Sequence, residues 1–303
     1  MLVKIYSTNK EPIRPLNSNS HNPAIQQTSD SPYETLTLLV KVSRPLGWIT
    51  APLVFSIGLF YSGAKLAPLS VLQILLLSFP YCILLYGTND IYDYKSDTLN
   101  PRKTSIKLDP KYHFIVKRFS SLAALLLVIG SLITLNLSNI LATVSLLFFS
   151  YYYSAPPIRF KERPPLDSFS NGALFFIVFS IGWSFGKGVS DIPAKIYFVS
   201  GCVAGIHSFS TVMDYTIDKG VGDRTFAVVF GKRTASVFAL VLFISTLMFS
   251  KIGRASINCY IAFCSLLFLI ASIFPSERLA FLLFKLIFIG FVVTAVAFLV
   301  SYL

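Results

Sequence analysis

Between Arg118 and Arg159 the sequence reads FSSLAALLLVIGSLITLNLSNILATVSLLFFSYYYSAPPI, a run of 40 residues (119–158) without a charged side chain. A helix that crosses the hydrocarbon core of a bilayer needs about 17 to 25 apolar residues, because its backbone must satisfy its own hydrogen bonds there. The run is therefore long enough for two crossings. Asn136, Ser138 and Asn139 lie near its middle and are typical of a polar turn between two helices.

Seven further apolar runs have lengths that suit one crossing each. They are 45–64, 66–89, 168–186, 196–213, 234–250, 255–276 and 279–303, the last with Lys285 inside it. With the two helices of 119–158 they predict an all-α polytopic membrane protein, a bundle of nine transmembrane helices. We expect a disordered cytosolic tail over residues 1–38, which is rich in Asn, Ser, Pro and Gln, and a nine-helix transmembrane domain over 39–303.

The composition of the chain also favours a membrane protein. Of its 303 residues, 54% are hydrophobic and 13% are charged, whereas about a quarter are charged in soluble domains. The net charge of +12 would suggest nucleic acid as a partner in a soluble protein. Here basic residues that flank the spans set topology and meet lipid headgroups, so we expect membrane lipid and no nucleic acid.

The basic residues also predict the orientation of the chain. With the N-terminus in the cytosol, 20 Lys and Arg fall on the cytosolic side and five on the outer side, as the positive-inside rule requires. The four cysteines lie within apolar runs and have no metal-binding spacing, so we interpret them as packing residues.

An acidic stretch ends the second predicted span on the cytosolic side: Asn89-Asp90-Ile91-Tyr92-Asp93-Tyr94-Lys95-Ser96-Asp97. On a helix, Asp90, Asp93 and Asp97 would share one face, because their spacing is i, i+3 and i+7. Three carboxylates on one face repel each other and so predict a bound cation. Their hard oxygen ligands suit Mg²⁺ shared with a phosphate.

A second acidic stretch, DYTIDKGVGDRT from Asp214 to Thr225, ends the sixth predicted span. Asp214 and Asp218 again share a helix face, while two glycines leave the direction of Asp223 undetermined. A weak internal repeat of about four helices would bring the two stretches face to face on the cytosolic side. The alternative is that each is a solvated helix end paired with basic neighbours, but the presence of two clusters favours a metal site.

Basic residues follow in the loop YYYSAPPIRFKERPP (residues 151–165), where four prolines forbid a regular helix. We expect this loop to be extended, so that Arg159 and Lys161 point the same way and hold a diphosphate. Arg102, shortly after the first acidic stretch, is a further candidate cation. His207 could line the cavity, but we favour a hydrogen-bonded packing role for it.

These groups predict a chemistry. Carboxylates bridged by Mg²⁺ and flanked by cations can neutralise a diphosphate as it leaves an allylic carbon. The allylic cation that remains must be shielded from water, and 28 Phe and 15 Tyr in a lipid-embedded bundle can supply such a pocket. The sequence thus predicts a polyprenyl diphosphate donor and a lipophilic acceptor.

From about residue 40 to 303, the three motifs in this order resemble the UbiA superfamily of intramembrane prenyltransferases. The resemblance implies two Mg²⁺ ions, with metal ligands at Asp90, Asp93, Asp97, Asp214 and Asp218, of which Asp90, Asp93, Asp214 and Asp218 are the catalytic set. It implies a diphosphate site that includes Asn89, Arg102, Tyr153, Arg159, Lys161 and Arg224.

The resemblance implies a Mg²⁺-dependent prenyltransferase, whose acceptor is an aromatic ring or an isoprenoid chain such as a carotenoid. The first motif and residues 159–172 look more like the lycopene-elongase branch than the hydroxybenzoate branch. Two alternatives stay open. The same aspartates would serve a terpene cyclase that uses no acceptor, and intramembrane acids could bind a cation in a transporter, although acids confined to one side argue against transport.

Overall fold

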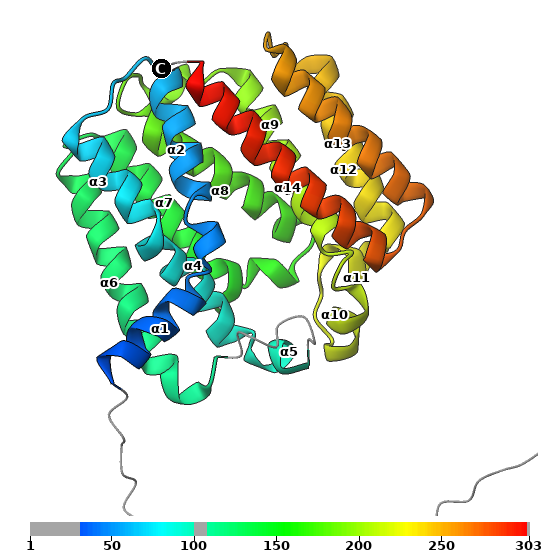
Figure 1. Ribbon diagram of the computed structural model, residues 1–303, viewed down its shortest axis with the longest axis horizontal. Coiled ribbons are helices and arrows are strands. Elements are labelled where there is room, and N and C mark those ends of the chain that lie inside the picture. The colour runs from blue at the N-terminus through cyan, green and yellow to red at the C-terminus, as the bar shows by residue number, and fades with distance from the viewer. Residues whose placement is uncertain (1–30, 100–107, 302–303) are drawn as a thin grey trace, which may run out of the picture.

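Residues 31–99 and 108–301 are described by the computed structural model, and within these ranges the chain consists of helices and loops, with no strand (Figure 1). In chain order the α-helices are α1 (Pro32–Val42), α2 (Thr50–Tyr61), α3 (Pro68–Leu77), α4 (Phe79–Tyr92), α5 (Tyr94–Leu99), α6 (His113–Leu132), α7 (Leu137–Ser154), α8 (Leu166–Trp183), α9 (Ala194–Ser210), α10 (Tyr215–Val221), α11 (Phe226–Phe230), α12 (Lys232–Phe249), α13 (Ala255–Ile273) and α14 (Glu277–Val300). Short 3-10 helices lie between some of them: η1 (Pro45–Gly47), η3 (Pro110–Tyr112), η4 (Phe160–Glu162) and η5 (Val189–Asp191). The all-α prediction is confirmed.

Several helical segments in the described ranges are long and apolar enough to cross a membrane. By length and composition there are six, or up to eight if two bent helix pairs each count as one span. These pairs are Pro32–Val42 with Pro45–Tyr61, bent by 53°, and Ala194–Ser210 with Tyr215–Val221, bent by 71°. Helix α7 is not a candidate, since tyrosine and other polar residues lower its mean hydropathy. The count of nine spans therefore stays a prediction.

The 40-residue uncharged run forms two helices, as predicted. Asn136 makes the turn between α6 and α7: its side-chain oxygen accepts hydrogen bonds from the backbone N–H groups of Ser138 (2.9 Å) and Asn139 (3.3 Å). Its amide donates to the carbonyl of Ser184 at 2.8 Å, which ties the turn to the end of α8. A polar N-cap thus stops one helix and starts the next.

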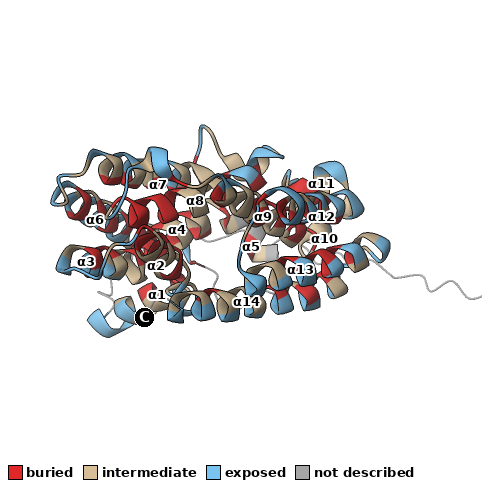
Figure 2. Cartoon of the chain, turned by 90° about the horizontal axis from the view of Figure 1, so that it is seen from above, coloured by how far each residue is buried: buried red, intermediate tan, exposed pale blue. Residues whose placement is uncertain are grey.

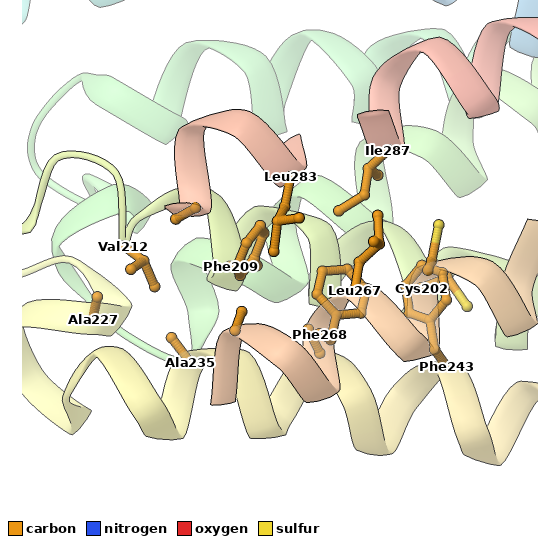
Figure 3. Close-up of a cluster of buried hydrophobic side chains, with 14 of the residues drawn as sticks. Cys202, Phe209, Val212, Ala227, Ala235, Phe243, Leu267, Phe268, Leu283 and Ile287 are labelled. Atoms are coloured by element: carbon orange, nitrogen blue, oxygen red, sulfur yellow. The ribbon is translucent and has the colours of Figure 1, made fainter. Parts of the chain in front are cut away.

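Two clusters of buried apolar side chains hold the bundle together. One lies mainly between α2, α4, α7 and α8 and includes Phe55, Phe179 and Trp183. The other joins α9, α12, α13 and α14, where the Phe268 ring meets the rings of Phe209 and Phe243 at centroid distances of 5.1 and 5.0 Å (Figure 3). Residues that face outward along the same helices are exposed and largely apolar (Figure 2). Such a surface suits lipid.

Helices α2 and α8 approach each other closely through two glycines. A Cβ atom on Gly58 would lie 2.2 Å from the carbonyl oxygen of Phe179, and one on Gly182 would lie 2.0 Å from that of Phe55. Small residues allow such contact between helices in membranes. This contact forms one wall of the interior cavities described below.

Helix α1 begins inside the segment that the sequence predicts as tail. Its first turn is capped by Ser31 and Glu34, whose side chains accept hydrogen bonds from each other's backbone N–H groups. Residues 1–30, which make up most of the predicted tail, lie outside the described residues. The division at residue 38 remains a prediction.

Candidate active site

The two acidic stretches meet at one end of the bundle, where α5 lies beside α10 (Figure 1). Between them is a polar pocket of about 200 Å³, here called the acidic pocket. Its carboxylates are Asp93 and Asp97 from the first stretch and Asp214, Asp218 and Asp223 from the second. The expectation that the stretches face each other is confirmed.

The first stretch bends where it enters the pocket. Helix α4 ends at Tyr92 and α5 starts at Tyr94, although i to i−4 hydrogen bonds of 2.9 Å continue through Asp93 and Asp97. Both of these aspartates are buried. Asp90 does not belong to the described lining of the pocket. It lies about 60° from Asp93 around the helix, and Arg44 contacts it at 2.5 Å.

The second stretch turns back on itself after α10. Gly222 adopts φ 83, a left-handed conformation that suits glycine, and the backbone N–H of Asp223 then donates to the carbonyl of Asp218 at 2.9 Å. The Asp218 carboxylate accepts a hydrogen bond from the Thr225 hydroxyl at 3.1 Å. The turn therefore directs Asp223 into the pocket, where burial raises the pKa of its carboxyl and nearby Lys161 opposes that rise.

Arg159 and Lys161 also reach the pocket. Lys161 Nζ contacts Asp93 Oδ1, and Arg159 Nη2 lies 3.6 Å from the same oxygen. Arg159 Nε is 2.6 Å from a carboxylate oxygen of Glu162. One buried carboxylate thus contacts both cations that the middle motif contributes.

The loop that carries these cations is not extended, so that prediction is wrong. Arg159 has φ 48, and Phe160–Glu162 forms the 3-10 helix η4. The backbone N–H of Arg159 donates to the carbonyl of Ala155 (3.1 Å), and that of Arg163 donates to the carbonyl of Phe160 (3.0 Å). These turn hydrogen bonds outweigh the extended preference of the prolines and still bring both cations to the same side.

The neutral candidates of the first and middle motifs join neighbouring helices at the pocket. The Asn89 side-chain oxygen accepts a hydrogen bond from the Ser154 hydroxyl at 2.9 Å, which links α4 to α7. The Tyr153 hydroxyl lies 2.7 Å from Nε2 of His207, and His207 Nδ1 lies 3.2 Å from the Ser168 hydroxyl. His207 therefore has the hydrogen-bonded packing role that we favoured, and it lines the pocket as well.

One predicted diphosphate ligand lies outside this arrangement, and a second falls outside the described residues. The Arg224 side chain is exposed and lies outside the described lining of the pocket. Arg102 lies outside the described residues. Neither position adds a described contact to the acidic pocket.

Sequence reasoning missed Asp167, which is 1% exposed at the start of α8. Its carboxylate accepts hydrogen bonds from the backbone N–H groups of Ser168 (2.6 Å) and Phe226 (2.9 Å). Beside it, the Thr211 hydroxyl accepts from the backbone N–H of Ala227 at 3.0 Å. These bonds hold the start of α11 and so the loop with Asp223. The sequence feature that could have identified Asp167 is its position directly before the apolar run 168–186.

The acidic pocket suits a metal ion that shares its ligands between protein and substrate. Among the described residues, no group of three or more His, Cys, Asp or Glu is spaced to hold one by itself. Mg²⁺ does not require such a group, because it usually keeps several waters and binds one or two carboxylates together with substrate phosphates. Carboxylates on opposite walls of a small pocket fit that mode of binding.

Two apolar cavities lie behind the acidic pocket. One of about 280 Å³ is lined from α2, α4, α8, α9 and α14, and one of about 360 Å³ extends toward α13. They share Phe175, Val203, Ile206 and Phe291. Their lining on α14 runs from Phe284 to Phe298, about 21 Å at 1.5 Å per residue. Ile206 directly precedes His207, so apolar space adjoins the acidic pocket.

Comparison with known proteins agrees with this arrangement. A lycopene elongase/hydratase of Haloarcula japonica is 32% identical over 220 residues, which cover 69% of this chain and 73% of that protein. A structure of digeranylgeranylglyceryl phosphate synthase is 25% identical and superposes with a TM-score of 0.66 over 89% of this chain and 99% of the other.

The fold also matches a UbiA homologue from Archaeoglobus fulgidus that was solved bound to GPP and Mg²⁺. It superposes with a TM-score of 0.61 over 86% of this chain and 99% of the other, at 21% identity. A model of the UbiA prenyltransferase family matches residues 49–302. Because that match spans most of the chain, the protein belongs to the UbiA prenyltransferase family, integral membrane enzymes that transfer prenyl groups.

Proposed function

We propose that this enzyme uses Mg²⁺ to ionise a polyprenyl diphosphate at the acidic pocket and joins the prenyl group to an isoprenoid chain of the carotenoid type. The observation that carries the proposal is the convergence of carboxylates from two distant stretches, with Lys161 and Arg159, on one pocket beside apolar cavities. The activity of the Haloarcula relative supports the choice of acceptor.

The proposed metal ligands in the acidic pocket are Asp93, Asp97, Asp214 and Asp218, with two ions expected. The role of Asp90 as a further ligand stays a prediction, because its carboxylate contacts Arg44 outside the described lining. When bound, Mg²⁺ supplies positive charge that stabilises the departing diphosphate. Lys161 and Arg159 neutralise Asp93 in the structure. They would move to phosphate oxygens once Asp93 binds metal, because Arg and Lys form strong charge-assisted bonds with phosphate.

The apolar cavities support long-chain substrates. Their combined run of about 21 Å along α14 is a large part of the roughly 30 Å thickness of a bilayer core. Aromatic side chains such as Phe175 and Phe291 line this run and would shield an allylic cation from water. A small aromatic acceptor would leave most of this space without a role.

Transfer is preferred here over cyclisation. A cyclase needs no second substrate, whereas two cavities that share lining residues offer room for a donor tail and an acceptor chain. The Haloarcula relative also carries the name of an enzyme that acts on lycopene. We further propose that the acidic pocket faces the cytosol, since the predicted cytosolic loops carry most of the Lys and Arg.

The test is a product analysis by mass spectrometry. Purified protein in lipid vesicles receives Mg²⁺ and farnesyl or geranylgeranyl diphosphate, with or without lycopene. We expect Mg²⁺-dependent release of diphosphate and a lycopene product heavier by one prenyl unit. A cyclic hydrocarbon formed without lycopene would instead identify a cyclase, and the absence of Mg²⁺-dependent turnover with either donor would contradict the proposal.

A further inference from the structure

His207 lies on α9 where the acidic pocket meets the apolar cavities. It lines the acidic pocket, and the preceding residue, Ile206, lines both apolar cavities. Its two ring nitrogens are both engaged, Nε2 with Tyr153 and Nδ1 with Ser168. Ser168 is completely buried and Tyr153 lines the pocket beside His207. A histidine at this border can meet a reacting group that is attached to an apolar chain.

The hydrogen bonds around His207 allow it to accept a proton on Nε2. In the tautomer with hydrogen on Nδ1, Nδ1–H donates to the Ser168 hydroxyl oxygen at 3.2 Å, and Nε2 accepts the hydroxyl hydrogen of Tyr153 at 2.7 Å. Tyr153 can thus pass its proton to His207 and take up another.

Most other groups that line the pocket are poor proton acceptors during the reaction. Asp93, Asp97, Asp214 and Asp218 are assigned to the metal, which leaves Asp223 as the one carboxylate of the described lining without an assigned role, and Lys161 is a cation held against Asp93. The remaining described lining consists of amide, hydroxyl and apolar side chains. Tyr153 and His207 form the neutral pair there that can take a proton.

We propose that Tyr153, with His207 as the final proton acceptor, removes the proton that the acceptor chain loses after prenyl transfer, and so determines whether the product is an alkene or an alcohol. This inference rests on the proposed function. It names the groups that complete the reaction once the two chains are joined.

The C–O bond of the donor breaks, and both of its electrons stay with the diphosphate. The electron pair of an acceptor double bond forms the new C–C bond and leaves a cation on the more substituted carbon. A neighbouring C–H bond then breaks, its electrons form a C=C bond, and its proton goes to the Tyr153 oxygen as the proton of Tyr153 moves to His207 Nε2.

Water is the competing reactant at the same carbon. If the proton is not removed in time, the oxygen of a water molecule adds to the cation and then loses one proton, which gives an alcohol. The ratio of alkene to alcohol therefore reports how well the proton is removed, whatever the overall rate. A merely structural role of His207 would change the yield of folded protein or the rate, and would leave this ratio as it is.

The experiment measures that ratio in the full chain. Wild type, Tyr153→Phe and His207→Gln are assayed with Mg²⁺, geranylgeranyl diphosphate and lycopene in H₂¹⁸O, and mass spectrometry separates the alkene from the ¹⁸O-labelled alcohol. Tyr153→Phe keeps the aromatic ring and removes only the hydroxyl, so it still tests the proton transfer if His207→Gln folds poorly. Ser210→Ala is the matched control, because its hydroxyl lies at the pocket and bonds only the backbone carbonyl of His207 at 2.7 Å among the described contacts.

We expect the alkene-to-alcohol ratio to fall at least about tenfold in Tyr153→Phe and His207→Gln, and to stay at the wild-type value in Ser210→Ala. An unchanged ratio in both relay variants, or a wild-type enzyme that forms only alcohol, would overturn the inference and leave the proposed function intact. A wild type that forms no prenylated lycopene at all would overturn the proposed function, and the inference with it.

Discussion

Arg44 Nη2 lies 2.5 Å from Asp90 Oδ1, and the Asp90 side chain is 1% exposed. The two residues are 46 positions apart. The Arg44 guanidinium also lies over the ring of Tyr86, at 4.5 Å from its centroid. A buried carboxylate that loses an ion partner is costly, because part of its charge compensation is removed. The pair therefore joins the end of α1 to the first acidic stretch.

We expect Arg44→Ala to lower the free energy of unfolding by about 1–3 kcal/mol, since it leaves a buried acceptor without this donor. Thermal unfolding in detergent measures the change. Arg44→Lys should recover part of the loss, because it restores the charge but not the flat guanidinium over Tyr86. Arg118→Ala, at an exposed position on α6, is the control. Equal melting temperatures for Arg44→Ala and Arg118→Ala would contradict a stabilising pair.

The second prediction concerns the proposed metal ligands. Asp93→Asn or Asp214→Asn should lower kcat by at least about a hundredfold while the folded yield stays near that of wild type, because each removes a charge that holds the metal. Chelation of Mg²⁺ by EDTA should stop wild-type turnover, and added Mg²⁺ should restore it. Asp191→Asn is the matched control, since this exposed aspartate lies in η5, outside the acidic pocket. Full activity in both pocket variants would refute the metal role.

The third prediction separates donor binding from acceptor binding. Lys161 neutralises Asp93 in the structure and is proposed to bind a phosphate oxygen of the donor. Lys161→Ala should therefore raise KM for the diphosphate donor about ten- to a hundredfold, in line with loss of a charged hydrogen bond of about 1.5–3 kcal/mol. KM for the acceptor should change little. Lys65→Ala, at an exposed loop position, controls for loss of one positive charge. A rise in KM for the acceptor alone would argue against phosphate binding.

The fourth prediction tests Asp167. Its two carboxylate oxygens accept hydrogen bonds from the backbone N–H groups of Ser168 and Phe226. Asp167→Asn replaces one of these oxygens by an NH₂ group, which cannot accept either bond. We expect a loss of stability of about 1–3 kcal/mol and lower turnover, because the loop with Asp223 would be held less firmly. Asp109→Asn is the matched control, because the Asp109 carboxylate also accepts a backbone N–H, that of Lys111, but at an exposed position. If both variants unfold at the same temperature, the proposed role of Asp167 is wrong.

Local patterns predicted much of the fold and of the site. The 40-residue uncharged run had to be divided, and Asn136 was the residue able to cap a new helix. The aspartates could be assigned to one functional site, because carboxylates close to the membrane interior are energetically costly and usually serve a function there. Such conclusions depend on residues close in the sequence, where helix geometry fixes which side chains share a face.

Contacts between residues that are far apart in the sequence could not be predicted from it. Nothing near Arg44 indicates that it pairs with Asp90, so it was counted only as a topology residue. The prolines of the middle loop suggested an extended chain, whereas the left-handed Arg159 and the turn at Phe160–Glu162 bring its cations to Asp93. A left-handed residue other than glycine costs about 1–3 kcal/mol, and surrounding contacts that the sequence does not reveal must offset that cost.

The last prediction concerns the passage between the two apolar cavities. Val203 is one of the residues that line both. Val203→Trp adds bulk there, so long acceptor or donor chains should no longer extend from the smaller cavity into the larger one. We expect turnover with geranylgeranyl diphosphate and lycopene to fall much more than the release of diphosphate from dimethylallyl diphosphate, whose short chain does not need the second cavity.

Val241→Trp is the matched control, because Val241 is 54% exposed on the outer face of α12. A tryptophan there enlarges a side chain that faces outward and leaves both cavities unchanged. If Val203→Trp lowers the rates with short and long donors by the same factor, its effect is general damage to the bundle. If it lowers only the long-chain rates, the two cavities act as one path, and the length of chain that the enzyme accepts is set by residues on α9 that line these cavities.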